Sequence, residues 1–226
     1  MDDSAINVLF LKLLSAAIWD KPADVTLFNN LDDRTWKQIF RLARLQSVSA
    51  LIACKALSLP QECLPPRQQN AALVSHVEQT RARNLKMMGV LATITDWYEE
   101  AGFPFVLLKG LANGINYPEP LLRNPGDVDL WLYRKGDSER AKTWLESKGY
   151  ETIDGNGIHY IFTEQGIHIE NHRRVSYFDH KKCDRQLAAM EKQAAEDEHF
   201  PFIQLGDLKV RQLPVEMNAF FLFHHM

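Results

Sequence analysis

The feature that most constrains the fold is the segment 126–132, which reads Gly-Asp-Val-Asp-Leu-Trp-Leu. Side chains alternate between the two faces of a strand, so the valine and the two leucines are predicted to share one apolar face. Asp127 and Asp129 then share the opposite face with Trp131. Two carboxylates on one face repel each other unless a positive charge lies between them. Mg²⁺ is usually held by one or two carboxylates plus substrate phosphates, so the pair predicts either a magnesium site or a solvated strand end.

Composition excludes several classes of protein. The 226 residues are 46% apolar and 24% charged, which is typical of a globular protein. The net charge of -3 gives no bulk attraction to long nucleic acid or to an anionic membrane. Three cysteines without metal-type spacing indicate reduced thiols, and we expect a cytoplasmic protein. Neither a leader peptide nor a membrane-spanning segment is expected.

The chain is predicted to change character near residue 103. Helical periodicity dominates before that point, including one long helix over about 67–101. We therefore expect a helical subdomain over 1–102 and a core of strands and helices over 103–213. Residues 214–226 are expected to begin a C-terminal helix that is still running at Met226, as in a chain cut from a longer one or in a helix that packs against a partner. The predicted fold class is α+β, with a small mixed sheet flanked by helices.

Strands are predicted at 105–108, 126–133, 159–163 and 166–172, with a last one at 208–213. The fourth of these contains Glu170, which shares a strand face with His168 and His172. If this strand pairs beside the aspartate strand, three carboxylates meet on one surface and could hold two metal ions about 3.5 to 4 Å apart. A second interpretation is a zinc or iron site built from His168, Glu170 and His172.

Lys109 and Gly110 follow the first predicted strand directly. Glycine permits close backbone approach, and amide groups at the start of the next helix can hold phosphate. Lys109 adds a positive charge. An ordinary strand-to-helix turn would also explain the pair. Arg123 could bind phosphate or neutralise the two aspartates.

Taken in order, these motifs resemble those of the bacterial uncharacterised nucleotidyltransferase family, within the DNA polymerase beta-like nucleotidyltransferase superfamily. The matching motifs are Leu108-Lys109-Gly110, Tyr117-Pro118, Arg123, Asp127-Val128-Asp129-Leu130, Gly149-Tyr150, His159 and Ile169-Glu170-Asn171-His172. The resemblance covers roughly residues 107–172 and implies a nucleotidyltransferase-like fold.

The resemblance also implies a function: Mg²⁺-dependent transfer of a nucleoside monophosphate from an NTP, with ATP expected, to an acceptor hydroxyl. It assigns Asp127, Asp129 and Glu170 as metal ligands and catalytic residues. Lys109, Gly110, Arg123 and His172 would bind substrate. A small molecule or a protein is the expected acceptor, ahead of long nucleic acid.

Two departures from the superfamily pattern stand in this sequence. Leu111 follows Gly110 where the superfamily usually has serine, and the third acid is a glutamate with His172 two residues later. The missing serine supports a second hypothesis, a catalytically weak or inactive nucleotide-binding or regulatory protein. The third hypothesis is a metal hydrolase built on His168, Glu170 and His172.

Overall fold

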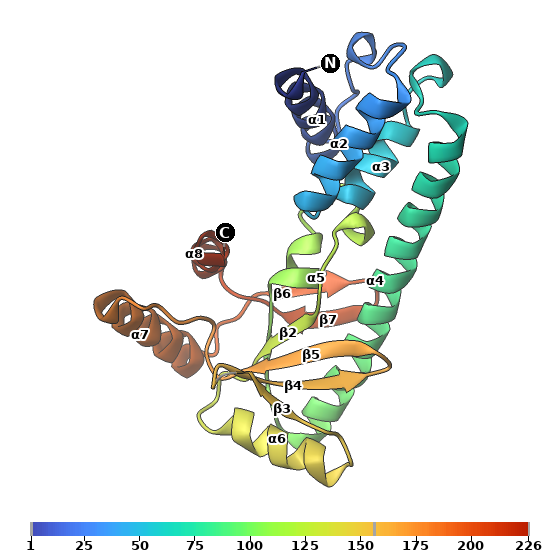
Figure 1. Ribbon diagram of the computed structural model, residues 1–226. Coiled ribbons are helices and arrows are strands. Elements are labelled where there is room, and N and C mark those ends of the chain that lie inside the picture. Colours follow the sequence, from blue (N-terminus) through green and yellow to red (C-terminus); the bar gives the residue numbers. More distant parts are fainter. Residues whose placement is uncertain (1, 156, 226) are drawn as a thin grey trace. The chain divides into compact units, whose positions relative to one another are not determined.

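The computed structural model describes residues 2–155 and 157–225. It confirms the α+β class, with helices, a five-stranded mixed sheet and a separate two-stranded sheet (Figure 1). The chain forms two compact units, one from Met1–Leu85 with Gly114–Asn124 and the other from Lys86–Asn113 with Pro125–Met226. The domain boundaries expected from the sequence stay a prediction, and Met226 itself lies outside the described residues.

The first unit is helical. Its elements are α1 (Asp3–Ile18), η1 (Val25–Leu27), α2 (Asp33–Leu45), α3 (Ser49–Leu57), η2 (Gln61–Cys63), residues 67–85 of α4 (Arg67–Ala101) and η3 (Pro120–Leu122). Trp36 is fully buried and stacks between Phe28 and Phe40, with ring centroids 5.9 and 5.6 Å away. The Asp32 carboxylate accepts a hydrogen bond from the Thr35 amide, so it caps α2 and fixes where this helix begins.

The second unit contains both sheets. Its elements are residues 86–101 of α4, β1 (Val106–Leu108), α5 (Lys109–Gly114), β2 (Val128–Trp131), α6 (Asp137–Ser147), β3 (Ile153–Gly155), β4 (His159–Glu164), β5 (Ile167–His172), α7 (Lys181–Asp197), β6 (Phe202–Leu205), β7 (Leu208–Arg211) and α8 (Val215–His225).

The larger sheet has the strand order β1-β2-β5-β4-β3. Strands β2 and β5 are parallel, and every other neighbouring pair is antiparallel. The register of β2 and β5 places Asp129 directly opposite Glu170. The pairing on which the predicted acidic cluster depends is therefore present.

Two strands were not predicted from the sequence. β3 is a short edge strand whose Ile153 is 59% exposed, so no alternation of buried and exposed residues marked it. β6 pairs with β7 across a turn at Gly206, and this turn was the missed signal.

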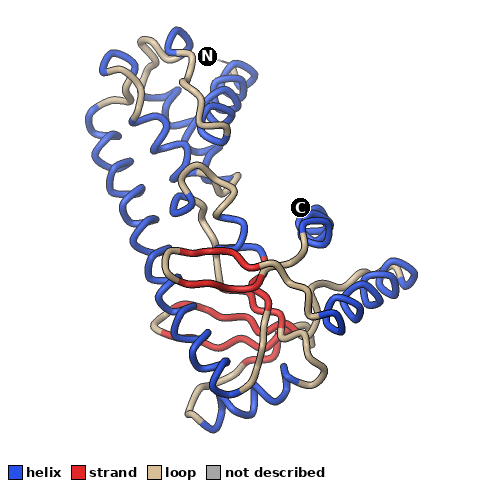
Figure 2. The backbone as a smooth tube through the Cα atoms, turned by 180° about the vertical axis from the view of Figure 1, so that it is seen from behind, coloured by secondary structure: helices blue, strands red, loops and turns tan. Residues whose placement is uncertain are grey.

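The two faces of the larger sheet contact different helices (Figures 1 and 2). Leu107, Leu130 and Ile169 face the last part of α4 and α6, where they pack against Ile94 and Leu145. The opposite face carries a second apolar cluster. It consists of Val106, Leu108, Trp131, Tyr133, Val175, Phe200, Leu213, Met217 and Phe221. Asp129 lies on this second face, because it alternates with Leu130 along β2.

Lys109 and Gly110 connect β1 to the regular part of α5. The bounds of α5 include both residues, but their backbone is not helical, which agrees with the turn predicted from the sequence. Lys109 and Gly110 both have positive φ, of 28° and 33°, and Gly110 is non-helical with ψ of -118°. A lysine in this region is strained, and such strain is found mainly at functional sites.

Among residues 2–155 and 157–225, no helix combines the length and the apolar character that crossing a membrane requires.

The first testable prediction concerns a buried hydrogen bond between β5 and α4. The Asn171 side-chain amide donates to the Tyr98 hydroxyl at 2.6 Å, and both side chains are fully buried. Tyr98→Phe removes the acceptor and should lower the free energy of unfolding by about 1 to 3 kcal/mol. Urea denaturation followed by tryptophan fluorescence measures this loss.

Tyr133→Phe is the matched control, because the buried Tyr133 hydroxyl has no hydrogen-bond partner among the described residues. Its free energy of unfolding should stay the same or rise. Equal losses in the two variants would show that the bond between Tyr98 and Asn171 is not what stabilises this region.

The second prediction concerns the backbone at Gly110. A Cβ there would lie 3.4 Å from the Asp127 carbonyl oxygen, at a φ that disfavours alanine. Gly110→Ala should therefore cost about 1 to 3 kcal/mol of stability. Gly89→Ala is the control, because a Cβ at Gly89 in α4 meets nothing within 4 Å. It should stabilise the protein by roughly 0.5 to 1 kcal/mol. Stabilisation by both substitutions would contradict the strain at Gly110.

Candidate active site

The centre of the candidate site is Asp129, whose side chain is fully buried in the middle of β2. Its partner in the parallel register is Glu170 on β5, so the two carboxylates point from the same sheet face. Asp127 lies in the loop one residue before β2 and is half-buried. Each of these three acids offers an oxygen within 4.8 Å of an oxygen of the other two. The structure thus brings the predicted triad together.

Lys109 supplies the nearest positive charge. Its ammonium nitrogen lies 2.9 Å from Asp129 Oδ1, and the lysine side chain is 23% exposed. Burial opposes the charge on Lys109, but the Asp129 carboxylate outweighs burial and raises the pKa of Lys109. The lysine therefore stays charged and compensates part of the buried negative charge.

His172 makes the second polar contact to Asp129. Its Nε2 lies 3.0 Å from Asp129 Oδ1 and 3.2 Å from Glu170 Oε2. Burial favours the neutral ring, but the hydrogen bonds to both carboxylates raise the pKa of His172. In turn, burial opposes the charge on Asp129, and the contacts with His172 and Lys109 hold the pKa of Asp129 below its usual range. The ring bridges the two acids and fixes their positions.

Asp127 is in a different electrostatic environment. Burial and then the neighbouring Asp129 charge raise the pKa of Asp127 to about 6, although Lys109 acts in the opposite direction. Burial first and the adjacent negative charge second thus disfavour the ionised form of Asp127. A bound cation would favour that form.

The residues present fit a divalent cation. Asp129 Oδ2 is buried, and no hydrogen-bond donor in the described part of the chain reaches it. Carboxylate oxygens are the ligands that Mg²⁺ prefers, and three are available at one point. Asp127, Asp129 and Glu170 would hold the ion.

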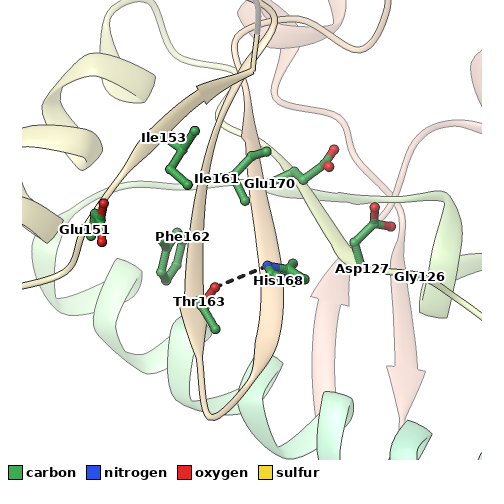
Figure 3. Close-up of a pocket in the computed structure, with 9 residues that line it drawn as sticks. All are labelled: Gly126, Asp127, Glu151, Ile153, Ile161, Phe162, Thr163, His168 and Glu170. Carbon is green, nitrogen blue, oxygen red and sulfur yellow. Dashed lines mark hydrogen bonds between the residues drawn. The ribbon is translucent and has the colours of Figure 1, made fainter.

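A cleft of about 540 Å³ opens beside the acids, and its volume is in the range of small-ligand sites. Figure 3 shows Asp127 and Glu170 next to each other at one end of the cleft. The rest of the lining is Gly126, Glu151, Ile153, Ile161, Phe162, Thr163 and His168. The cleft thus has Asp127 and Glu170 at one end and the apolar side chains of Ile153 and Ile161 further along it.

Gly110 lies against the acidic loop through its backbone. A Cβ built on Gly110 would lie 3.4 Å from the Asp127 carbonyl oxygen and 3.7 Å from Pro125 Cβ. The predicted proximity of Gly110 to the aspartates is therefore present. Arg123 belongs to the other compact unit, so its role in phosphate binding stays a prediction.

The histidine triad proposed from the sequence needs a correction. His168 and His172 are four residues apart on β5, or roughly 13 Å at the usual strand rise. One ion cannot bind both. His168 instead contacts the Thr163 hydroxyl through Nδ1 at 3.2 Å, as Figure 3 shows. Besides the three acids, the described part of the chain contains a second group that could hold a metal ion, formed by His159, Glu170 and His172.

His159, for which the sequence favours packing or a hydrogen bond over metal binding, lies next to Glu170 and His172 in the structure. It lies on β4 directly opposite His172, and its ring centroid is 4.9 Å from that of His172. The short turn between the two strands could have revealed this pairing. An antiparallel hairpin that turns at Gln165 and Gly166 pairs residues whose numbers add to a constant, and 159 and 172 satisfy it.

Comparison with known proteins gives one match. The sequence matches the family model described as uncharacterised nucleotidyltransferase over residues 32–226, a span that includes all three acids. No curated protein and no solved structure matches the chain. Because the matched span covers well over half of the 226 residues, the chain belongs to the uncharacterised nucleotidyltransferase family.

Proposed function

We propose that the protein transfers a nucleoside monophosphate from an NTP, with ATP as the expected donor, to an acceptor hydroxyl in a Mg²⁺-dependent reaction. The observation that carries this proposal is the convergence of Asp127, Asp129 and Glu170 around a buried oxygen that lacks a donor. Membership of a nucleotidyltransferase family supports the reaction class. We also place the chain in the DNA polymerase beta-like superfamily.

In the proposed reaction the acceptor oxygen bonds to the α-phosphorus, the bond to the bridging oxygen breaks and pyrophosphate leaves. Divalent cations in such sites lower the pKa of the attacking hydroxyl and stabilise charge on the leaving oxygen. Asp127, Asp129 and Glu170 hold these ions in the proposal, and Glu170 is also the proposed base that accepts the hydroxyl proton.

Lys109 and His172 position the acids in this proposal. Both contact Asp129 Oδ1, at 2.9 and 3.0 Å, and together they hold the buried carboxylate in one orientation. Lys109 is also exposed enough to reach a phosphate, and it would replace the serine contact that Leu111 cannot make. Direct contact of His172 with substrate stays a prediction, because its side chain is only 6% exposed.

The cleft favours a small acceptor or a nucleotide base. Its volume of about 540 Å³ and the apolar side chains of Ile153 and Ile161 suit a flat ring. A small molecule or a protein side chain remains the proposed acceptor.

A second candidate function is nucleotide binding without turnover. The specific observation in its favour is the ammonium of Lys109 on Asp129 Oδ1, where it supplies part of the charge that a metal ion would bring. The absence of serine after Gly110 points the same way.

The third prediction tests the metal and nucleotide site by isothermal titration of ATP with Mg²⁺. The wild type should bind, and Asp127→Asn and Asp129→Asn should each weaken binding at least about tenfold, because both remove a metal ligand. Asp207→Asn, at an exposed turn, is the control and should bind as the wild type does. Equal affinities in all four proteins would remove the argument for a metal site.

The same proteins separate the two candidate functions. Pyrophosphate release from ATP across a panel of small-molecule and protein acceptors would support the transferase. Binding that depends on Asp127, combined with no release for any acceptor, would favour the binding protein.

A further inference from the structure

The proposed transfer reaction has no role for His159, which forms a cluster with Glu170 and His172. The cluster lies on β4 and β5, on the same sheet face as Asp129. Each of the three offers a ligand atom within 4.8 Å of the others. Imidazole nitrogens are poor ligands for Mg²⁺ and good ones for zinc and similar transition metals. The chemistry of this cluster thus differs from that of the three acids.

The distances suit a tetrahedral metal centre. His159 Nδ1 lies 3.6 Å from Glu170 Oε2, and His172 Nε2 lies 3.2 Å from the same oxygen. Ligands 2.0 to 2.1 Å from a tetrahedral zinc ion are about 3.3 to 3.4 Å from each other. The two observed distances bracket this spacing.

Gly155 makes room for the His159 ring. It is the partner of His159 in the register of β3 and β4. A Cβ on Gly155 would clash with Nε2 and Cδ2 of that ring. Packing against Gly155 therefore holds the ring with Nδ1 available to Glu170.

One nitrogen of the cluster, His159 Nδ1, is free to bind a metal ion. His159 Nδ1 is buried and has no hydrogen-bond partner among residues 2–155 and 157–225, because 3.6 Å to Glu170 is too long. A buried nitrogen without a partner is costly, and a metal ion would satisfy it.

We propose that His159, Glu170 and His172 form a binding site for a transition metal ion of the Zn²⁺ class. Three protein ligands leave one tetrahedral position open for water or for an oxygen of a substrate. The proton that His172 Nε2 now shares with the two carboxylates leaves to solvent when the metal binds. Glu170 belongs to both ligand sets, so the metal lies next to the proposed magnesium site.

The fourth prediction tests this site with Co²⁺, a spectroscopic substitute for zinc. The full chain, stripped with a chelator, should bind one equivalent of Co²⁺ with a visible tetrahedral absorption band, and Zn²⁺ should abolish the band. His159→Ala should weaken Co²⁺ binding at least about tenfold. Gly155→Ala should do the same, because it displaces the ring.

His168→Ala is the matched control, since His168 shares the strand and the face but not the cluster. It should bind Co²⁺ as the wild type does. Absence of the band in the wild type overturns the proposal, as does unchanged binding in His159→Ala. If circular dichroism shows that His159→Ala does not fold, His159→Gln takes its place, and the wild-type titration alone still decides.

The experiments distinguish failure of the proposed Zn²⁺-class site from failure of the proposed transfer reaction. Asp127→Asn should keep the Co²⁺ band, because Asp127 is not one of the three ligands. A protein that binds Co²⁺ through His159 and never releases pyrophosphate would keep the metal site and lose the transferase.

Discussion

The parallel pairing of β2 with β5 is the constraint on which the candidate site depends. It places Asp129 opposite Glu170, although α6, β3 and β4 separate them in the chain. These two carboxylates have oxygens within 4.8 Å of each other, and Asp129 is fully buried. Without positive charge nearby, they would destabilise the fold. Lys109 and His172 compensate for the charge through contacts of 2.9 to 3.2 Å. The acids are therefore held by the sheet and tolerated because of these two side chains.

The apolar face of the sheet fixes the register that the acids require. Leu130 and Ile169 are fully buried against α4 and α6. A slip of β2 by one residue would turn Leu130 toward the cleft and Asp129 into the apolar core. Burial of an unpaired carboxylate there would cost several kcal/mol. Packing on one side of the sheet thus specifies the chemistry on the other side, and the site needs no rigid loop to bring Glu170 to Asp129.

Sequence reasoning predicted what depends on local pattern. The alternation of acidic and apolar residues along 126–132 was enough to place Asp129 on one face of a strand. The helical periodicity of apolar residues was enough to find α4. Sequence reasoning did not find β3, because an exposed edge strand has no alternation of apolar and polar residues. It also did not predict that His159 lies beside Glu170 and His172, because that proximity depends on strand register. The contact between Lys109 and Asp129 was also missed. Lys109 makes this contact from a backbone with positive φ at two consecutive residues, and a lysine in the sequence does not predict such a conformation.

Glu170 links the two proposed metal sites, and this has an energetic consequence. Its Oε2 contacts His172 at 3.2 Å, while its carboxylate also belongs to the group with Asp127 and Asp129. A cation on the histidine side withdraws negative charge from Glu170 and replaces the proton on His172. The first change weakens the binding of a second cation by Asp127, Asp129 and Glu170. Loss of the hydrogen bond from His172 has the opposite effect, because it leaves Asp129 more negative. Because repulsion between two divalent ions adds to the first effect, binding at the two sites should be mutually weakening unless a triphosphate lies between them.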